Sequence, residues 1–318
     1  MKEMHASQVL KAPMFAIRLL FKLKKRSGGR EVLQVLRDRF GMSNDNATAV
    51  SKKLKMLASP LLARKRTRTR AVPIRVPGSL AVDGWVKLQD ESVSGSKELV
   101  QHCTRVFENR KAEILSNYAP PFSLIFDVGS SIARPDEIEP VVRFCAQRPI
   151  FDLATSYLGE YPALGNISFG YTAPDSGRVG SQLFHCDSNE PRQLHMILPI
   201  WPIDMESGPF TFLPAQSSAR LRKEIKHDRG RIPDDVVFSH VSEDEQIYCT
   251  GEPGDVYFVN PYACFHCGAR TRSKPRLILI VNFTSLFQGV EPSNGLYSAA
   301  NRKELDDGRQ ETRFLLNL

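Results

Sequence analysis

The sequence has no hydrophobic run close to the ~20 residues that a membrane-spanning helix needs, which argues against an integral membrane protein. Only six of its 318 residues are cysteine, and they are scattered along the chain with no visible secretory signal. A disulfide-stabilised secreted domain is therefore not expected. Reduced thiols and a cytoplasmic location are expected instead.

Acidic residues are scarce at the start of the chain. Residues 1–70 carry 4 Asp and Glu against 18 Lys and Arg, whereas the remainder carries 31 acidic and 25 basic residues. The chain therefore divides into a basic N-terminal segment, 1–70, and a mildly acidic body, 71–318. The boundary is expected in the basic, proline-containing linker 63–78.

Helical patterns fill the basic segment, at 12–29, 30–41 and 44–62. A helical appendage that packs on the body is the favoured interpretation. Two alternatives are peripheral association of 13–26 with a membrane surface and organelle targeting by residues 1–30. Nucleic-acid binding is a further alternative, but the basic clusters have no interleaved aromatic residues, so no sequence-specific reader is expected.

The sequence pattern of the body changes from helical to strand-like along its length. A strand–turn–strand pattern at 80–88 precedes amphipathic helices at 96–114 and 135–159. After residue 160, short β-branched and aromatic runs alternate with turn residues. This spacing predicts a mainly β fold, a barrel or sandwich core at about 160–290, with flanking helices.

Two histidines and an aspartate have the spacing of a metal site. His185 and Asp187 lie two apart in a predicted strand, so their side chains point to one side while Cys186 faces away. A third ligand must come from another strand, and the turn, strand and extended stretch "GDVYFVNPYACFHCG" (254–268) could bring His266 alongside. Two His and one carboxylate on one face of an ion are typical of non-haem Fe(II) sites that leave positions open for substrate and oxygen.

Arg276 opens the apolar run "RLILIVNF" ten residues after His266. A keto-acid co-substrate such as 2-oxoglutarate needs a cation for its far carboxylate, and an arginine fork fits a carboxylate better than a lysine does. Arg276 is therefore the candidate that binds this carboxylate.

Simpler interpretations exist for each of these residues. The histidines and Asp187 could be unrelated polar residues, and Arg276 could belong to a surface ion pair in a basic loop. Cys264 and Cys267 flank His266 as C-x-x-C, but no second pair exists to complete a zinc site. His195 lies in an apolar strand, where a core histidine is more common than a pocket residue.

The ordered set of motifs resembles the phytanoyl-CoA dioxygenase-like family of Fe(II)/2-oxoglutarate-dependent oxygenases, over roughly 80–290. The matching elements are "HCD" at 185–187, "DMESGPF" at 204–210, "GDVYF" at 254–258, His266 and Arg276. The resemblance implies a double-stranded β-helix, or jelly-roll, core. It also implies Fe(II), 2-oxoglutarate and O₂ as cofactor and co-substrates.

The resemblance further implies oxidative decarboxylation of 2-oxoglutarate to succinate and CO₂, with hydroxylation as the usual outcome. Halogenating relatives replace the carboxylate ligand, and the intact Asp187 argues against that branch. The keto-acid end of the co-substrate has no fixed motif in the family, and Gln182, Tyr171 and Asn166 are candidates for it. We therefore expect a dioxygenase that acts on a small organic or lipid-like molecule. The alternative is a non-catalytic, cupin-like protein that binds a small molecule or metal.

Overall fold

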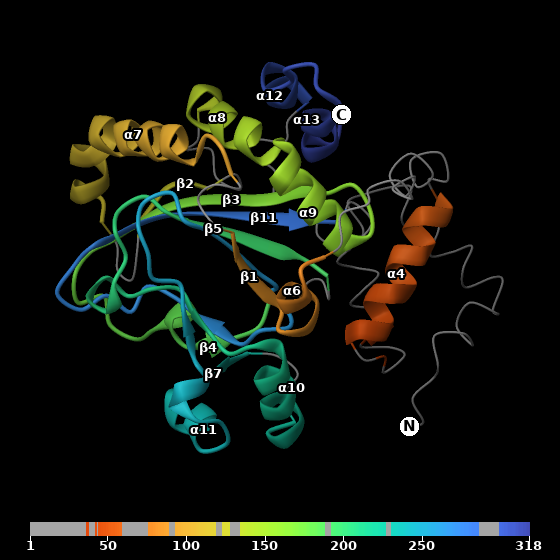
Figure 1. Cartoon of the computed structure of the whole chain (residues 1–318), viewed down its shortest axis with the longest axis vertical. Coiled ribbons are helices and arrows are strands. Elements are labelled where there is room, and N and C mark those ends of the chain that lie inside the picture. The colour runs from red at the N-terminus through yellow and green to blue at the C-terminus, as the bar shows by residue number, and fades with distance from the viewer. Residues whose placement is uncertain are drawn as a thin grey trace.

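The structure, a computed structural model, describes residues 36–37, 42, 44–58, 76–88, 93–118, 123–127, 134–187, 192–226, 230–285 and 299–318. Two antiparallel sheets face each other, and helices cover the outer side of both (Figure 1). The prediction of a mainly β jelly-roll core with flanking helices is confirmed. Among the described residues, no helix is both long and apolar enough to cross a membrane.

The larger sheet has six strands. They are β1 (Trp85–Leu88), β2 (Ser123–Asp127), β3 (Ala163–Thr172), β5 (Leu194–Pro199), β9 (Val256–Val259) and β11 (Arg276–Thr284). Their order is β1-β9-β5-β11-β3-β2. Along β11, Leu277 and Leu279 join the core on the helix side, whereas Arg276 and Ile278 face the second sheet. The alternation of side chains along a strand thus divides β11 between a helix-facing core and the jelly-roll interior.

The smaller sheet is built from five two-residue strands. They are β4 (Phe184–His185), β6 (Thr211–Phe212), β7 (Arg231–Ile232), β8 (Ile247–Tyr248) and β10 (His266–Cys267), in the order β7-β4-β10-β6-β8. Phe212 is buried toward the larger sheet, and Phe184 is buried in a separate cluster on the outer side. Because β10 is the central strand, His266 lies between β4 and β6.

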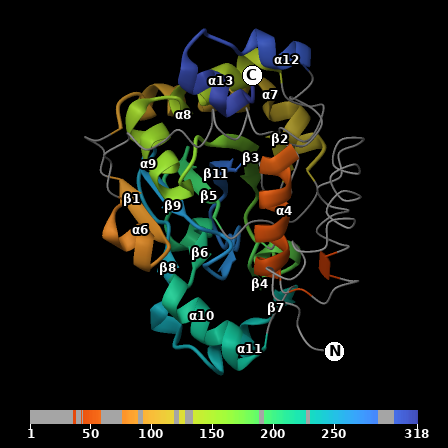
Figure 2. The same ribbon diagram turned by 90° about the vertical axis from the view of Figure 1, so that its right-hand side faces the viewer.

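Helices close both outer faces. Those that gather over the larger sheet are α7 (Ser96–Ser116), α8 (Pro135–Cys145), α9 (Arg148–Leu158), α12 (Ala299–Glu304) and α13 (Gln310–Leu316). Beneath the smaller sheet lie α10 (Ala215–Glu224) and α11 (Asp234–Phe238) (Figures 1 and 2). The helices predicted at 96–114 and 135–159 are confirmed, and the second is two helices because α8 ends at Cys145 and α9 begins at Arg148, with Pro149 in its first turn.

Within the basic segment the structure describes one long helix, α4 (Asn44–Ala58), where a helix over 44–62 is predicted. Lys52 of α4 forms an ion pair of 2.6 Å with Glu160, which follows α9. Residues 36–37 are helical, and the rest of the predicted helix at 30–41, the helix at 12–29 and the linker up to residue 75 lie outside the described residues.

The strand–turn–strand prediction at 80–88 is wrong in its first half. Residues 78–82 form the short helix α6 (Gly78–Val82), and only the second half is a strand, β1. The reason is topological, because β1 is an edge strand that pairs with β9 alone and leaves residues 78–82 without a ladder partner. Their backbone bonds locally instead, with the Asp83 N–H donating to the Ser79 carbonyl at 2.6 Å.

Candidate metal centre

His185 and Asp187 come from the end of β4. Phe184 is buried in the outer cluster, so the next residue, His185, faces the interior. Cys186 turns outward again, where Arg222 Nη2 lies 3.1 Å from its sulfur. Asp187 then lies on the interior side, and its backbone N–H donates to the Pro261 carbonyl at 2.9 Å.

His266 reaches the same place from β10. It pairs directly with His185 across the two strands, and the centroids of the two imidazole rings are 4.3 Å apart. One ligand atom from each of His185, Asp187 and His266 lies within 4.8 Å of the others. Among the described residues this is the one group of three His, Cys, Asp or Glu side chains that converges in this way. The structure therefore brings together the three residues whose spacing predicts a metal site.

Both histidines are held so that one ring nitrogen stays available. His185 Nδ1 contacts the Leu183 carbonyl at 2.9 Å, and His266 Nδ1 contacts the Cys264 carbonyl at 3.0 Å. A carbonyl only accepts, so each Nδ1 carries the proton and each Nε2 keeps its lone pair. Burial, followed by the neighbouring His266, lowers the pKa of His185 to about 4, and burial also lowers the pKa of His266. Neutral rings with bare Nε2 atoms are the form that binds a metal ion.

A cavity of about 250 Å³ extends from this cluster between the two sheets. One wall is the inner face of the larger sheet, where Ile278 and Ile280 lie beside the polar residues Ser168 and Thr172. Across it, the ring of Phe210 stacks on His266 with centroids 5.2 Å apart. The cavity therefore has apolar walls with polar groups at defined places, as is typical of a small-molecule site.

Arg276 lines the same cavity, and its charge is not neutralised by the described part of the chain. It is 5% exposed, its Nη1 donates to the Gly208 carbonyl at 3.1 Å, and its Nε has no hydrogen-bond partner there. None of the described carboxylates forms an ion pair with it. Burial lowers its pKa to about 10. A buried guanidinium without a counter-charge favours an anion in the cavity.

The three residues predicted to hold the keto-acid end of a co-substrate have different locations. The side-chain amide of Gln182 is hydrogen-bonded to Ser176, Val179 and Ala269, and Gln182 itself does not line the cavity. Tyr171 faces the helices, where its ring stacks on Phe107 with centroids 5.5 Å apart. The structure therefore does not bring either side chain to the cluster.

Strand alternation explains the location of Tyr171, since its neighbours Gly170 and Thr172 are the residues of β3 that line the cavity. Asn166 is on that inner face, and its Nδ2 donates to Ser168 Oγ at 2.8 Å, although Asn166 itself does not line the cavity. The alternation of side chains along β3 is the sequence signal that separates Tyr171 from the residues that face the cavity.

His195 lies in the cavity, although the sequence favours an ordinary core histidine. It lies on the inner face of β5 and lines the cavity, with its Nε2 3.4 Å from Asp187 Oδ2. Phe210, the last residue of the "DMESGPF" motif, also lines the cavity. Cys264 and Cys267 belong to different hydrophobic clusters, so the C-x-x-C pair does not converge on one ion.

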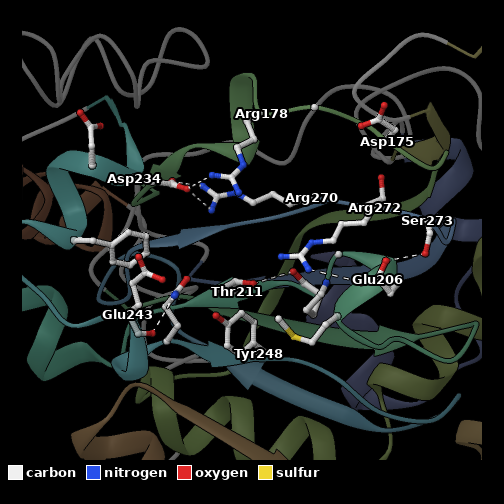
Figure 3. Close-up of a pocket in the computed structure, with 18 residues that line it drawn as sticks. Asp175, Arg178, Glu206, Thr211, Asp234, Glu243, Tyr248, Arg270, Arg272 and Ser273 are labelled. Atoms are coloured by element: carbon white, nitrogen blue, oxygen red, sulfur yellow. Dashed lines mark hydrogen bonds and ion pairs between the residues drawn. The ribbon is translucent and has the colours of Figure 1, made fainter.

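A larger pocket of about 920 Å³ lies on the opposite side of β6. Figure 3 shows that its arginines are directed at carboxylates, Arg178 and Arg270 at Asp234 and Arg272 at Glu206, which also accepts a hydrogen bond from Ser273. The arginines of this pocket are paired with carboxylates of the protein, whereas Arg276 in the smaller cavity has no such partner in the described part of the chain.

Comparison of the sequence with family models and with curated proteins gives no match. Among solved structures, EctD from S. alaskensis with bound Fe is similar at 17% identity, with a TM-score of 0.50 over 70% of this chain and 81% of that chain. Its apo form gives 16% identity and a TM-score of 0.50 over 71% and 82%. The non-heme alpha ketoglutarate dependent epimerase SnoN from nogalamycin biosynthesis gives 13% identity and a TM-score of 0.43 over 69% and 85%. The likeness to EctD shows that this chain has the same fold.

Proposed function

We propose that this protein is an Fe(II)- and 2-oxoglutarate-dependent oxygenase. The observation that carries the proposal is the buried Arg276, which has no ion-pair partner among the described residues and lies in the same small cavity as the His185–Asp187–His266 cluster. A metal cluster alone fits many functions. A metal cluster with one buried cation in the same cavity fits a ligand that has a chelating end and a distant carboxylate.

The donor set fits Fe(II). Two imidazole nitrogens and one carboxylate are the ligands of the non-haem iron triad, and two of the three are held by backbone carbonyls before any metal binds. EctD, which shares the fold, was solved with bound Fe, and this supports the assignment. When bound, Fe(II) would supply the redox chemistry that couples decarboxylation of 2-oxoglutarate to oxidation of a C–H bond by O₂.

The protein's own residues have separate tasks in this proposal. His185, Asp187 and His266 hold the ion, and Arg276 binds the distal carboxylate and so orients 2-oxoglutarate along the cavity. Ile278, together with the other apolar wall residues, excludes water from the space between metal and arginine. The intact Asp187 supports hydroxylation over halogenation. The ordered motifs support a place in the phytanoyl-CoA dioxygenase-like branch, with a small organic or lipid-like substrate.

Release of CO₂ from 2-oxoglutarate labelled at its C1 carboxylate tests the proposal. We expect wild-type protein to release CO₂ only with both Fe(II) and O₂, and Asp187→Ala to release none above the protein-free rate. Equal release by wild type and Asp187→Ala, or no release by either, would contradict an oxygenase at this site. A binding protein on the same fold would then be the better description.

A further inference from the structure

We infer that His195 positions the Asp187 carboxylate for metal binding, as part of a ring of polar contacts with Asn282 and Gln193. The inference rests on the proposed function, because it concerns the same metal cluster. His195 lies on β5 directly opposite Asn282 on β11, and Gln193 immediately precedes β5. None of these three residues belongs to the convergent group of ligands.

The two oxygens of Asp187 have different neighbours. Oδ1 lies 3.9 Å from His266 Nε2, on the side of the ligand cluster. Oδ2 lies 3.4 Å from His195 Nε2. A carboxylate only accepts hydrogen bonds, so the contact is attractive when His195 carries its proton on Nε2. In this arrangement His195 fixes one oxygen and thereby directs the other oxygen toward the histidines.

The ring also contacts the backbone of Asp187. Gln193 Nε2 donates to the Asp187 carbonyl at 3.5 Å, and Gln193 Oε1 accepts from Asn282 Nδ2 at 3.0 Å. Because a carbonyl cannot donate, this chain of contacts fixes the orientation of both amides. Asn282 Nδ2 lies 3.3 Å from His195 Nε2. Because an Nε2 that donates to Asp187 cannot also accept from this amide, Asn282 limits the position of the ring by packing and forms no hydrogen bond with it. The carbonyl and the carboxylate of Asp187 are thus restrained by the same three side chains.

The neighbourhood of His195 supports this role over an ordinary core role. A buried core histidine normally has partners for both ring nitrogens. His195 Nδ1 has no hydrogen-bond partner in the described chain, and the contacts of the ring are made through Nε2. The adjacent residues Leu194 and Met196 pack on the helix side, so the polar side chain of His195 is accommodated on the inner face beside Asp187.

Anaerobic titration with Co(II), which gives a visible spectrum that reports its ligands, tests the inference. We expect His195→Leu to weaken Co(II) binding by about 10–100-fold, the usual effect of removing a partner that orients a metal ligand. His195→Gln keeps an N–H donor at a similar reach and should recover most of the affinity and the wild-type spectrum. Asn282→Ala should weaken binding less than His195→Leu does.

Two controls separate positioning from folding. His102→Leu removes another partly buried imidazole, whose Nε2 contacts the Glu137 carbonyl on α8, and should leave Co(II) affinity unchanged. Thermal melting of each metal-free variant shows whether it folds. If His195→Leu does not fold, the Co(II) affinities of His195→Gln and Asn282→Ala test the positioning role instead. Wild-type affinity in His195→Leu, or equal losses in the Leu and Gln variants, would overturn the positioning role alone. Failure of wild-type protein to bind Co(II) through His185 would overturn the proposed function together with this inference.

Discussion

The polar residues of the cavity differ in whether other parts of the protein supply their hydrogen-bond partners and balance their charge. The Nδ1 atoms of His185 and His266 have backbone partners, so these rings are ready to bind a metal at little conformational cost. Arg276 is the opposite case, because its buried charge has one carbonyl partner and no carboxylate among the described residues. Such a group destabilises the empty protein and is stabilised by an anionic ligand.

Arg276→Met should therefore separate stability from binding. We expect the melting temperature of the ligand-free protein to stay equal or rise, because a buried charge without a carboxylate partner among the described residues is replaced by an apolar chain of similar length. The affinity for 2-oxoglutarate should fall by about 10–100-fold, since hydrogen bonds to charged groups are worth about 1.5–3 kcal/mol. Calorimetric titration and thermal melting measure the two effects.

Arg272→Met is the matched control for this substitution. Arg272 belongs to the same chain segment, but its side chain is 65% exposed. Both the melting temperature and the 2-oxoglutarate affinity should be unchanged in this variant. A loss of affinity as large as that of Arg276→Met would mean that the charge of the segment, and not the buried arginine, attracts the ligand.

At the scale of elements, the segment from Asp204 to Phe210 connects the outer surface to the cavity. Asp204 caps the short helix η3 (Met205–Ser207), Gly208 offers its carbonyl to Arg276, and Phe210 stacks on His266. Gly208 has φ 66°, and a Cβ there would lie 2.4 Å from the backbone of Arg270 and Thr271. This close approach requires glycine.

Gly208→Ala should accordingly lower both stability and 2-oxoglutarate affinity. Gly177→Ala is the comparison, since Gly177 also has a positive φ of 78° but open space within 4 Å of a Cβ. That control should cost roughly 1–2 kcal/mol of unfolding free energy from backbone strain alone. Denaturant unfolding should show a larger loss for Gly208→Ala, and titration should show weaker 2-oxoglutarate binding only in that variant. Equal effects of the two substitutions would contradict the close approach.

Asp204 makes the stability of this segment depend on pH. The hydrogen bond from Lys274, followed by that from Ser207, lowers the pKa of Asp204 from 3.8 to about 2. A carboxyl whose pKa is lower in the folded protein stabilises it above the unfolded value, and this contribution is lost as pH falls through the folded value. The gap in melting temperature between wild type and Asp204→Asn should be constant above pH 3.8 and narrow toward pH 2.

Lys274→Met removes the hydrogen bond that contributes most to the lowered pKa of Asp204, and so tests whether this bond causes the pH dependence. In this background the pH dependence of the gap should become shallower. A gap that stays constant across the whole range, or that widens as the pH falls, would show that Asp204 does not stabilise the folded segment through its charge.

At the scale of the whole molecule, the sequence predicts the layers better than the cavity. The strand-rich texture after residue 160 predicts the jelly roll, and the His-x-Asp spacing predicts two ligands because both sit on one strand end. The pairing of His266 with His185 depends on a strand register that no local pattern encodes. The same holds for His195, whose contact with Asp187 arises from the packing of two sheets. Tyr171 faces the helices because it lies on the opposite face of β3 from the cavity-lining residues Gly170 and Thr172.

The attachment of α4 to the body is a further property of the whole molecule. The Glu160 side chain is 2% exposed, and Lys52 of α4 is its ion-pair partner. Lys52→Ala should lower the free energy of unfolding by about 1–3 kcal/mol, because it leaves a buried acceptor without its donor. Glu160→Gln in the same background should recover part of the loss in denaturant unfolding. An unchanged midpoint in Lys52→Ala would contradict docking of α4 through this pair.

The most direct test of the metal and co-substrate assignment is an anaerobic titration of the purified protein with Fe(II) and then 2-oxoglutarate. The measurement is the visible charge-transfer absorption that a keto acid gives when it chelates Fe(II). We predict the band in wild type, its loss in His185→Ala, and a much higher 2-oxoglutarate requirement in Arg276→Ala. The absence of the band in wild-type protein with Fe(II) bound would contradict the account.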